Sequence, residues 1–173
     1  MKDAITSSVF RCYINPDWKE TGIARVAIAR WNGARGVTAT GFLIDMYCMG
    51  VKDVMEGAFR TPEDVEADFV PMLYFDGIPK TIPFEEAREI VCGAVFYARD
   101  LGFPPHPDFD KAGRFLEIER YAPDGKLRLG GPNGKPLYIA GPFDPAEKIM
   151  RTLEARLGKD GFEFIWAPED FVV

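Results

Sequence analysis

The sequence predicts an α+β fold, with an antiparallel sheet packed against two or three amphipathic helices, in a single domain over residues 1–173. Three patterns predict this fold: alternating apolar residues on both sides of a turn at 32–33, helical periodicity over 84–101, and a helix-start signature at 144–147. The length is typical of one domain, and no internal repeat or linker divides the chain. We expect roughly the first eight residues to fray, because chain ends are the least constrained part of most domains.

A β-hairpin is predicted over residues 23–45. Apolar residues alternate with Arg25 and Arg30 in the first strand, Asn32-Gly33 supplies a turn with positive φ, and Gly36 to Asp45 form the second strand. Apolar or small residues occupy both faces of that second strand, so we expect both faces to be covered. The run from 46 to 54 is interpreted as a strand end that passes into a short helix.

Two helices are predicted in the middle of the chain. Thr61-Pro62 begins one that runs towards Phe69 and ends before Pro71, because proline disfavours the helix around it. The second covers Phe84–Leu101 and has apolar residues at the three-and-four spacing of one buried face. Its outer face carries the residues that solvent exposure favours, among them Glu85, Glu86, Arg88 and Glu89.

The last third of the chain is rich in turn signals. Asp108 is predicted to cap a short helix, and two Pro-Asx-Gly turns predict a second hairpin that joins residues 126–129 to 136–139. Asp144 is predicted as the N-cap of a helix over Pro145–Leu157, with Glu147 completing a capping box and Leu157 facing inward. Residues 162–166 alternate as a final strand.

Composition restricts the partners and the compartment. The chain has 27 acidic and 21 basic residues, a net charge of −6, which argues against nucleic-acid binding. Arg25 and Arg30 lie five residues apart and would face opposite sides of a sheet. No apolar run approaches a membrane span or a secretory signal, and the three cysteines have no disulfide-framework pattern. We therefore expect a cytoplasmic protein that does not bind a membrane.

A few polar residues are candidates for chemistry. His106, the only histidine, needs a carboxylate such as Asp108 or Asp45 to orient it. Asp45 and Asp53 near a strand end could hold Mg²⁺ for phosphoryl transfer, although Asp45 could equally cap the next turn and Asp53 could pair with Lys52. The cysteines and the histidine lack the close spacing of zinc ligands, so no metal or cofactor is assigned.

The block at 41–53 reads Gly41-Phe42-Leu43-Ile44-Asp45-Met46-Tyr47-Cys48-Met49-Gly50-Val51-Lys52-Asp53. It resembles the Phe-Leu-Val-Asp-x-Tyr-Cys-Leu-Gly-Val-Lys-Asp block of a family of bacterial proteins of unknown function, which also share stretches like 97–109 and 133–144. The resemblance spans residues 23 to 145 and implies a bacterial origin but no activity. It implies that a site would lie among Asp45, Cys48, Lys52, Asp53, His106 and Asp108.

The leading functional hypothesis is a small non-catalytic interaction or regulatory module, because no catalytic constellation is complete in the sequence. A protein partner is expected, and exposed members of the fourteen phenylalanines would mark its surface. In this hypothesis Cys48, Lys52 and Asp108 are binding residues. The alternative is a metal-assisted hydrolase or nuclease whose catalytic residues are Asp45, Asp53 and His106. The sequence leaves the oligomeric state open.

Overall fold

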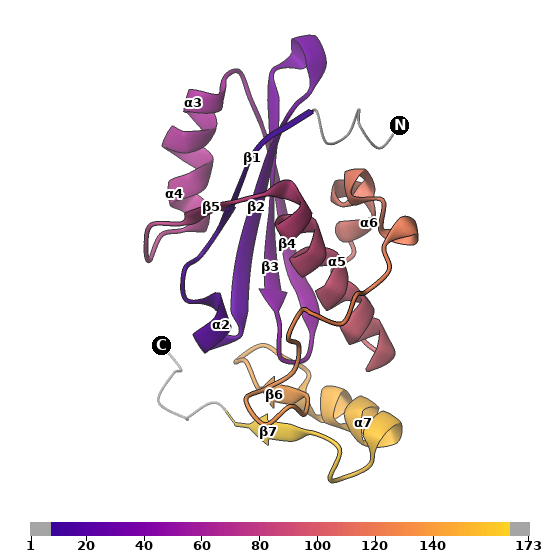
Figure 1. Ribbon diagram of the computed structural model, residues 1–173. Helices are drawn as coiled ribbons and strands as arrows, with labels where there is room; N and C mark the ends of the chain where they lie inside the picture. Colours follow the sequence, from indigo (N-terminus) through magenta and orange to yellow (C-terminus); the bar gives the residue numbers. More distant parts are fainter. Residues whose placement is uncertain (1–7, 167–173) are drawn as a thin grey trace.

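A computed structural model describes residues 8–166 and shows a five-stranded antiparallel sheet covered by helices on both faces, which confirms the α+β prediction (Figure 1). The strand order is β4-β3-β2-β1-β5. The strands are β1 (Val9–Ile14), β2 (Ile23–Trp31), β3 (Val37–Asp45), β4 (Gly50–Phe59) and β5 (Lys80–Ile82). None of the helices within the described range is long and apolar enough to cross a membrane.

The predicted hairpin is formed by β2 and β3. The two strands pair without a break from Ile23 opposite Asp45 to Trp31 opposite Val37. Gly33 and Gly36 in the connecting loop have φ angles of 58° and 91°, which a residue with a side chain adopts only under strain. Nearly every residue of β3 is buried, so both faces of this strand are covered as expected.

The helix expected within residues 46–54 is wrong: a tight turn at 46–49 leads directly into β4. The carboxylate of Asp45 accepts backbone hydrogen bonds inside this turn, which fixes the chain reversal. Gly50 then has a φ of +67° and lies against α5, where a Cβ would meet Ala98 Cβ at 2.7 Å. A bulge follows, because Leu43 pairs with Asp53 while Ile44 pairs with Val51, leaving Lys52 as the extra residue.

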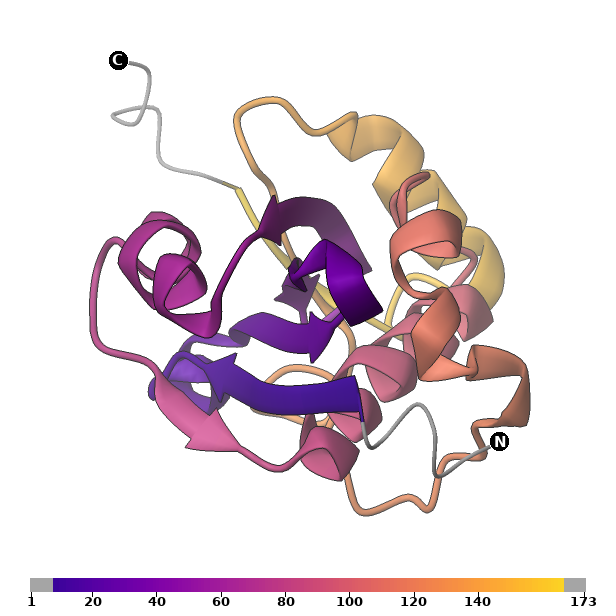
Figure 2. The same cartoon turned by 90° about the horizontal axis from the view of Figure 1, so that it is seen from above.

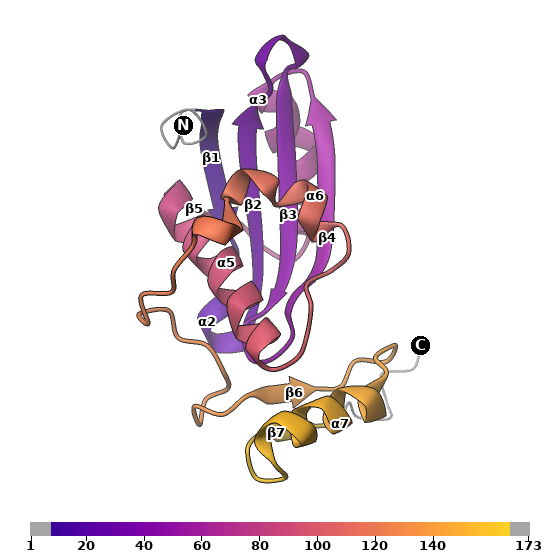
Figure 3. The ribbon, with the colours of Figure 1, turned by 90° about the vertical axis from the view of Figure 1, so that its right-hand side faces the viewer.

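One face of the sheet is covered by helix α5 (Phe84–Asp100), which matches its predicted range closely. Figure 3 shows α5 crossing the strands diagonally, with the short helix α6 (Phe109–Ala112) beside it on the same face. Between α5 and the sheet lies a core that includes Val26, Phe42 and Ile90, each at most 1% exposed. Asp108 precedes α6 as predicted, but its side chain makes no capping hydrogen bond.

The opposite face is covered by a helical segment built from α3 (Pro62–Asp64), a π-helical turn (Val65–Phe69) and α4 (Val70–Leu73). Thr61 and Asp64 form the capping box at its start. The segment continues past Pro71, so the predicted end before this proline is wrong. The π-helical turn explains the continuation. It has a wider hydrogen-bonding pattern than an α-helix and comes just before Pro71, the residue that has no N–H to donate. Figure 2 shows the sheet between the two helical layers.

The end of the described chain forms a small unit at one end of the sheet (Figure 1). Strands β6 (Leu137–Ile139) and β7 (Glu163–Ile165) pair in parallel, and helix α7 (Ala146–Leu157) connects them. The second hairpin predicted for 126–139 is therefore wrong, since 126–129 is not a strand. Leu127 and Leu129 pack instead against the α5 core, and the final predicted strand supplies the partner of β6.

Two details of α7 also differ from the prediction. Asp144 does not cap the helix, because its Oδ2 accepts hydrogen bonds from the Gly141 N–H at 3.0 Å and the Tyr138 hydroxyl at 3.3 Å. Ile149 and Leu153 are buried as expected, but Leu157 is 37% exposed because the helix ends beyond the edge of the core. The helix thus buries a shorter apolar stripe than its sequence predicts.

Candidate ligand-binding cavity

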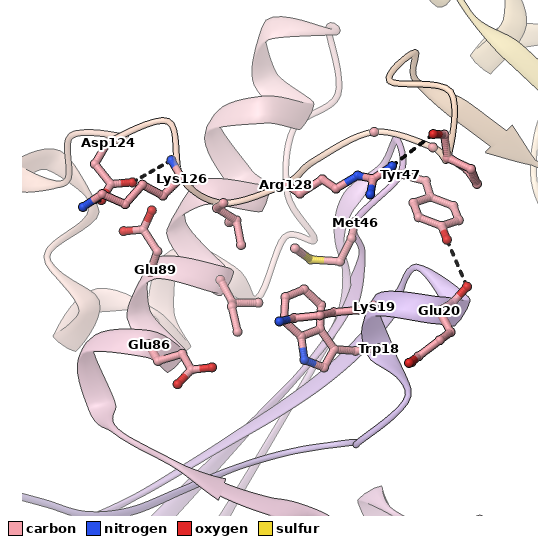
Figure 4. Close-up of a pocket in the computed structure, with 15 residues that line it drawn as sticks. Trp18, Lys19, Glu20, Met46, Tyr47, Glu86, Glu89, Asp124, Lys126 and Arg128 are labelled. Atoms are coloured by element: carbon pink, nitrogen blue, oxygen red, sulfur yellow. Dashed lines mark hydrogen bonds and ion pairs between the residues drawn. The ribbon is translucent and has the colours of Figure 1, made fainter.

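A cavity of about 640 Å³ lies where four segments meet at the end of the sheet nearest the C-terminal unit. They are helix α2 (Trp18–Thr21), the β3–β4 turn, the first half of α5, and the loop over residues 124–132. Figure 4 shows the lining side chains of this α2–α5 cavity. Because these segments are far apart in the sequence, the cavity exists only in the folded protein.

The base of the cavity is apolar. Met46 and Ile90 are 2% and 1% exposed and belong to the core between α5 and the sheet. Trp18, Tyr47 and Leu127 are half-buried and line the cavity next to them. A ligand in this position would bury apolar surface against a preformed wall, which is the usual source of affinity in small-molecule sites.

Several charged groups at the rim already have partners. Lys126 Nζ lies 3.0 Å from Asp124 Oδ2, and hydrogen bonds from Lys126 lower the pKa of that carboxylate. Arg128 donates a hydrogen bond to the carbonyl of Pro132 at 3.0 Å. Glu89 accepts a 2.7 Å hydrogen bond from the hydroxyl of Tyr121. Burial is the main cause of the raised pKa of the Tyr121 phenol, and this hydrogen bond is the second.

Other charged groups of the rim have no such partner. Within the described part of the chain, no hydrogen bond or ion pair holds the side-chain carboxylates of Glu20 and Glu86. The ammonium of Lys19 has no carboxylate partner there either, and lies 5.3 Å from the centre of the Trp18 ring. The cavity therefore offers free charges of both signs around an aromatic surface.

The structure places Asp45, the first candidate catalytic residue, in a structural position. Its carboxylate is only 9% exposed and accepts backbone hydrogen bonds from Tyr47 (2.9 Å), Cys48 (3.2 Å) and Met49 (3.0 Å). Burial raises the pKa of Asp45, and the three N–H donors oppose that rise. Its oxygens are used to hold the turn, which is the capping role that the sequence left open.

Cys48 and Lys52 lie on the far side of the same turn. Cys48 is fully buried, and burial raises the pKa of its thiol to about 12. Lys52 Nζ lies 3.6 Å from Asp144 Oδ2, so it links β4 to the C-terminal unit instead of pairing with Asp53. Both residues are near Asp45, but neither lines the α2–α5 cavity.

Asp53, His106 and Asp108 come together at the edge of β4. His106 Nε2 lies 3.9 Å from Asp53 Oδ1, and its Nδ1 accepts a hydrogen bond from the Asp108 N–H at 3.2 Å. The backbone N–H of His106 also donates a hydrogen bond to the Val51 carbonyl, which anchors the loop to β4. No group of three His, Cys, Asp or Glu residues within 8–166 is placed to hold a metal ion, and Asp45 does not join this cluster.

Several apolar side chains outside the cavity lining are exposed. Phe75, Ile78 and Phe143 are 76%, 87% and 97% exposed. Arg25 pairs with Asp76 next to Phe75, whereas Arg30 lies over the ring of Phe115 on the other face of the sheet. The prediction that these two arginines face opposite sides is confirmed.

Sequence reasoning did not identify the cavity. It placed Glu86 and Glu89 on the solvent side of the helix, and the structure shows that they also border the cavity. Their three-residue spacing on one helix face was the only local signal. Nothing in the sequence around Trp18 indicates that it lines a cavity together with residues of α5.

No protein-family model, curated protein or solved structure matches the chain.

Proposed function

We propose that this protein is a non-catalytic regulatory module that binds a small organic molecule in the α2–α5 cavity. The observation that carries the proposal is the cavity itself, whose volume of about 640 Å³ suits a small ligand. Pockets that bind small molecules measure about 300–1,000 Å³ and combine apolar walls with a few polar groups. Met46, Ile90 and Trp18 supply such walls, and the charged rim supplies the polar groups.

The composition of the lining favours binding over covalent chemistry. Among the described residues, no serine, threonine, cysteine or histidine borders the cavity, so it lacks a hydroxyl-amino-acid or thiol nucleophile paired with an imidazole base. Asp124 and Lys126 lie at the solvent edge, 3.0 Å apart, and neutralise each other. These features support a site that holds a ligand without changing it.

The metal-assisted hydrolase or nuclease has less support. Asp53 and His106 do lie 3.9 Å apart, but the third member of the proposed set, Asp45, uses both oxygens for backbone hydrogen bonds. Removing it from that role would break a buried turn. The arrangement therefore favours Asp45 as a structural residue.

Ligand-observed NMR with a library of small metabolites tests the proposed function. We expect binders for the wild-type protein that are lost in Trp18→Ala, because this change removes the aromatic wall of the cavity. Trp31→Ala is the matched control, since Trp31 is 47% exposed at the other end of β2 and does not line the cavity. The proposal fails if no compound binds, or if Trp18→Ala leaves every binder unaffected.

A further inference from the structure

The contact between Lys19 and Trp18 shows what the aromatic wall of the cavity attracts. The Lys19 ammonium lies 5.3 Å from the centre of the Trp18 ring, and both side chains line the cavity (Figure 4). Tryptophan is the aromatic side chain that binds cations best, through the negative face of its π-system. Lys19 is an exposed residue, so its flexible side chain can move into solvent when another cation takes the place of its ammonium on the Trp18 ring.

The carboxylates of α5 add to this attraction. Glu86 and Glu89 lie three residues apart on the helix and both border the cavity; Figure 4 shows Glu86 towards Trp18 and Glu89 towards Asp124 and Lys126. Like charges at this spacing repel each other, and a cation between them and Trp18 would relieve the repulsion. Glu89 accepts a hydrogen bond from the Tyr121 hydroxyl and interacts electrostatically with Lys126, whereas the Glu86 carboxylate has no hydrogen bond or ion pair among the described residues.

The cations of the lining make their direct contacts with groups other than Glu86 and Glu89. Lys126 pairs with Asp124, and Arg128 is bonded to the Pro132 carbonyl. Four carboxylates and three cationic side chains line the cavity, so its formal charge is negative. An additional positive charge would therefore neutralise the lining.

We infer that the α2–α5 cavity selects organic cations, namely ammonium compounds with an aromatic or aliphatic body. The body packs on Met46 and Ile90, and the ammonium lies on the Trp18 ring within the field of Glu86. The Lys19 ammonium lies over the Trp18 ring in the free protein and is displaced when the ligand binds. This inference rests on the proposed function and names the ligand class of that same site.

A pair of probes of matched shape tests the charge directly. 2-Phenylethylamine is protonated at neutral pH, and 2-phenylethanol differs from it by a neutral hydroxyl group in place of the ammonium. We expect the amine to bind about tenfold more tightly than the alcohol in NMR chemical-shift titrations, a ratio typical of a partly desolvated cation–π contact beside a carboxylate. The preference should shrink as salt is added, because salt screens the interaction with Glu86.

Two variants identify the groups responsible. Glu86→Gln should remove most of the preference for the amine without changing the affinity for the alcohol. Glu85→Gln is its matched control, since Glu85 is the exposed neighbour on α5 that does not line the cavity. Lys19→Met should strengthen binding of the amine several-fold, because the competing ammonium is gone.

Equal affinities for the two probes, no effect of Glu86→Gln, or weaker amine binding by Lys19→Met would each overturn the inference. If neither probe binds at millimolar concentration, the cation assignment is also wrong. The metabolite screen with Trp18→Ala decides separately whether the cavity binds small molecules at all. Failure of the ligand class is thus distinguishable from failure of the proposed function.

Discussion

Replacing Asp45 by asparagine removes one acceptor from a buried turn. Asp45 Oδ1 accepts the N–H groups of Tyr47 and Cys48, and Oδ2 accepts that of Met49. The carbonyl oxygen of asparagine can keep the first two bonds. Its amide NH₂ would then face the Met49 N–H, so two donors would oppose each other in a largely buried turn.

The expected loss of stability follows from that single donor. Leaving a buried donor without an acceptor costs about 1–3 kcal/mol, so we expect Asp45→Asn to lower the free energy of unfolding by about 2 kcal/mol. Urea unfolding followed by far-UV circular dichroism at about pH 5 measures this difference. Asp53→Asn is the control, because Asp53 is 58% exposed and its hydrogen bond from the Val54 N–H survives in asparagine. It should cost less than about 0.5 kcal/mol.

The loss of stability in Asp45→Asn should depend on pH, in a direction set by the pKa of Asp45. Burial raises the pKa of Asp45 in the folded protein above its ordinary value of 3.8, so the folded state binds this proton more tightly than the unfolded state. The contribution of Asp45 to stability is therefore complete below about pH 3.8, and it declines as the pH rises through the pKa of Asp45 in the folded protein. Asparagine does not titrate, so the destabilisation by Asp45→Asn should be greatest in acid and smaller at neutral pH. A destabilisation equal to that of Asp53→Asn, or one that grows with pH, would refute this reasoning.

Two further predictions concern packing. Leu153→Ala, at a fully buried position of α7, should lower the free energy of unfolding by about 2–5 kcal/mol in urea titrations. Leu157→Ala should lower it by less than about 1 kcal/mol. Similar losses for the two variants would contradict the exposed position of Leu157. Burial raises the pKa of the thiols of Cys12, Cys48 and Cys92 to about 12, so Ellman's reagent should react with the native protein far more slowly than with the unfolded chain at mildly alkaline pH, and a fast native reaction would contradict that burial.

Local patterns were sufficient for some elements and not for others. The hairpin of β2 and β3 and helix α5 were predicted because alternation and three-and-four spacing are visible within a short window of sequence. Strand β4 was missed, since the bulge at Lys52 interrupts its alternation and Gly50 reads as a helix or turn signal. That strand is held by its pairing with β3, and the approach of α5 to Gly50 adds a contact between residues far apart in the chain.

Polar residues with several possible partners were harder still. Asp144 has the sequence context of a helix cap, yet it binds Gly141 and Tyr138 and lies near Lys52. Asp45 looks equally suited to a metal site and to a turn, and only the positions of the following N–H groups decide between them. The cavity was not predicted because its aromatic wall and its carboxylates come from segments about seventy residues apart, with no periodic relation between them.

Residues 46–49 join two parts of the molecule through backbone hydrogen bonds on both sides of the turn. The N–H groups of Tyr47, Cys48 and Met49 donate to Asp45 at the end of the sheet, while the carbonyls of Met46 and Tyr47 accept from the N–H groups of Gly130 (3.0 Å) and Leu137 (3.1 Å). Proteins open in cooperative segments of unequal stability, and amide hydrogen exchange measures the free energy of each opening. If the unit of β6, α7 and β7 opens separately from the sheet, the Gly130 and Leu137 amides lie on the boundary, and their exchange rates would measure how strongly the two parts are coupled.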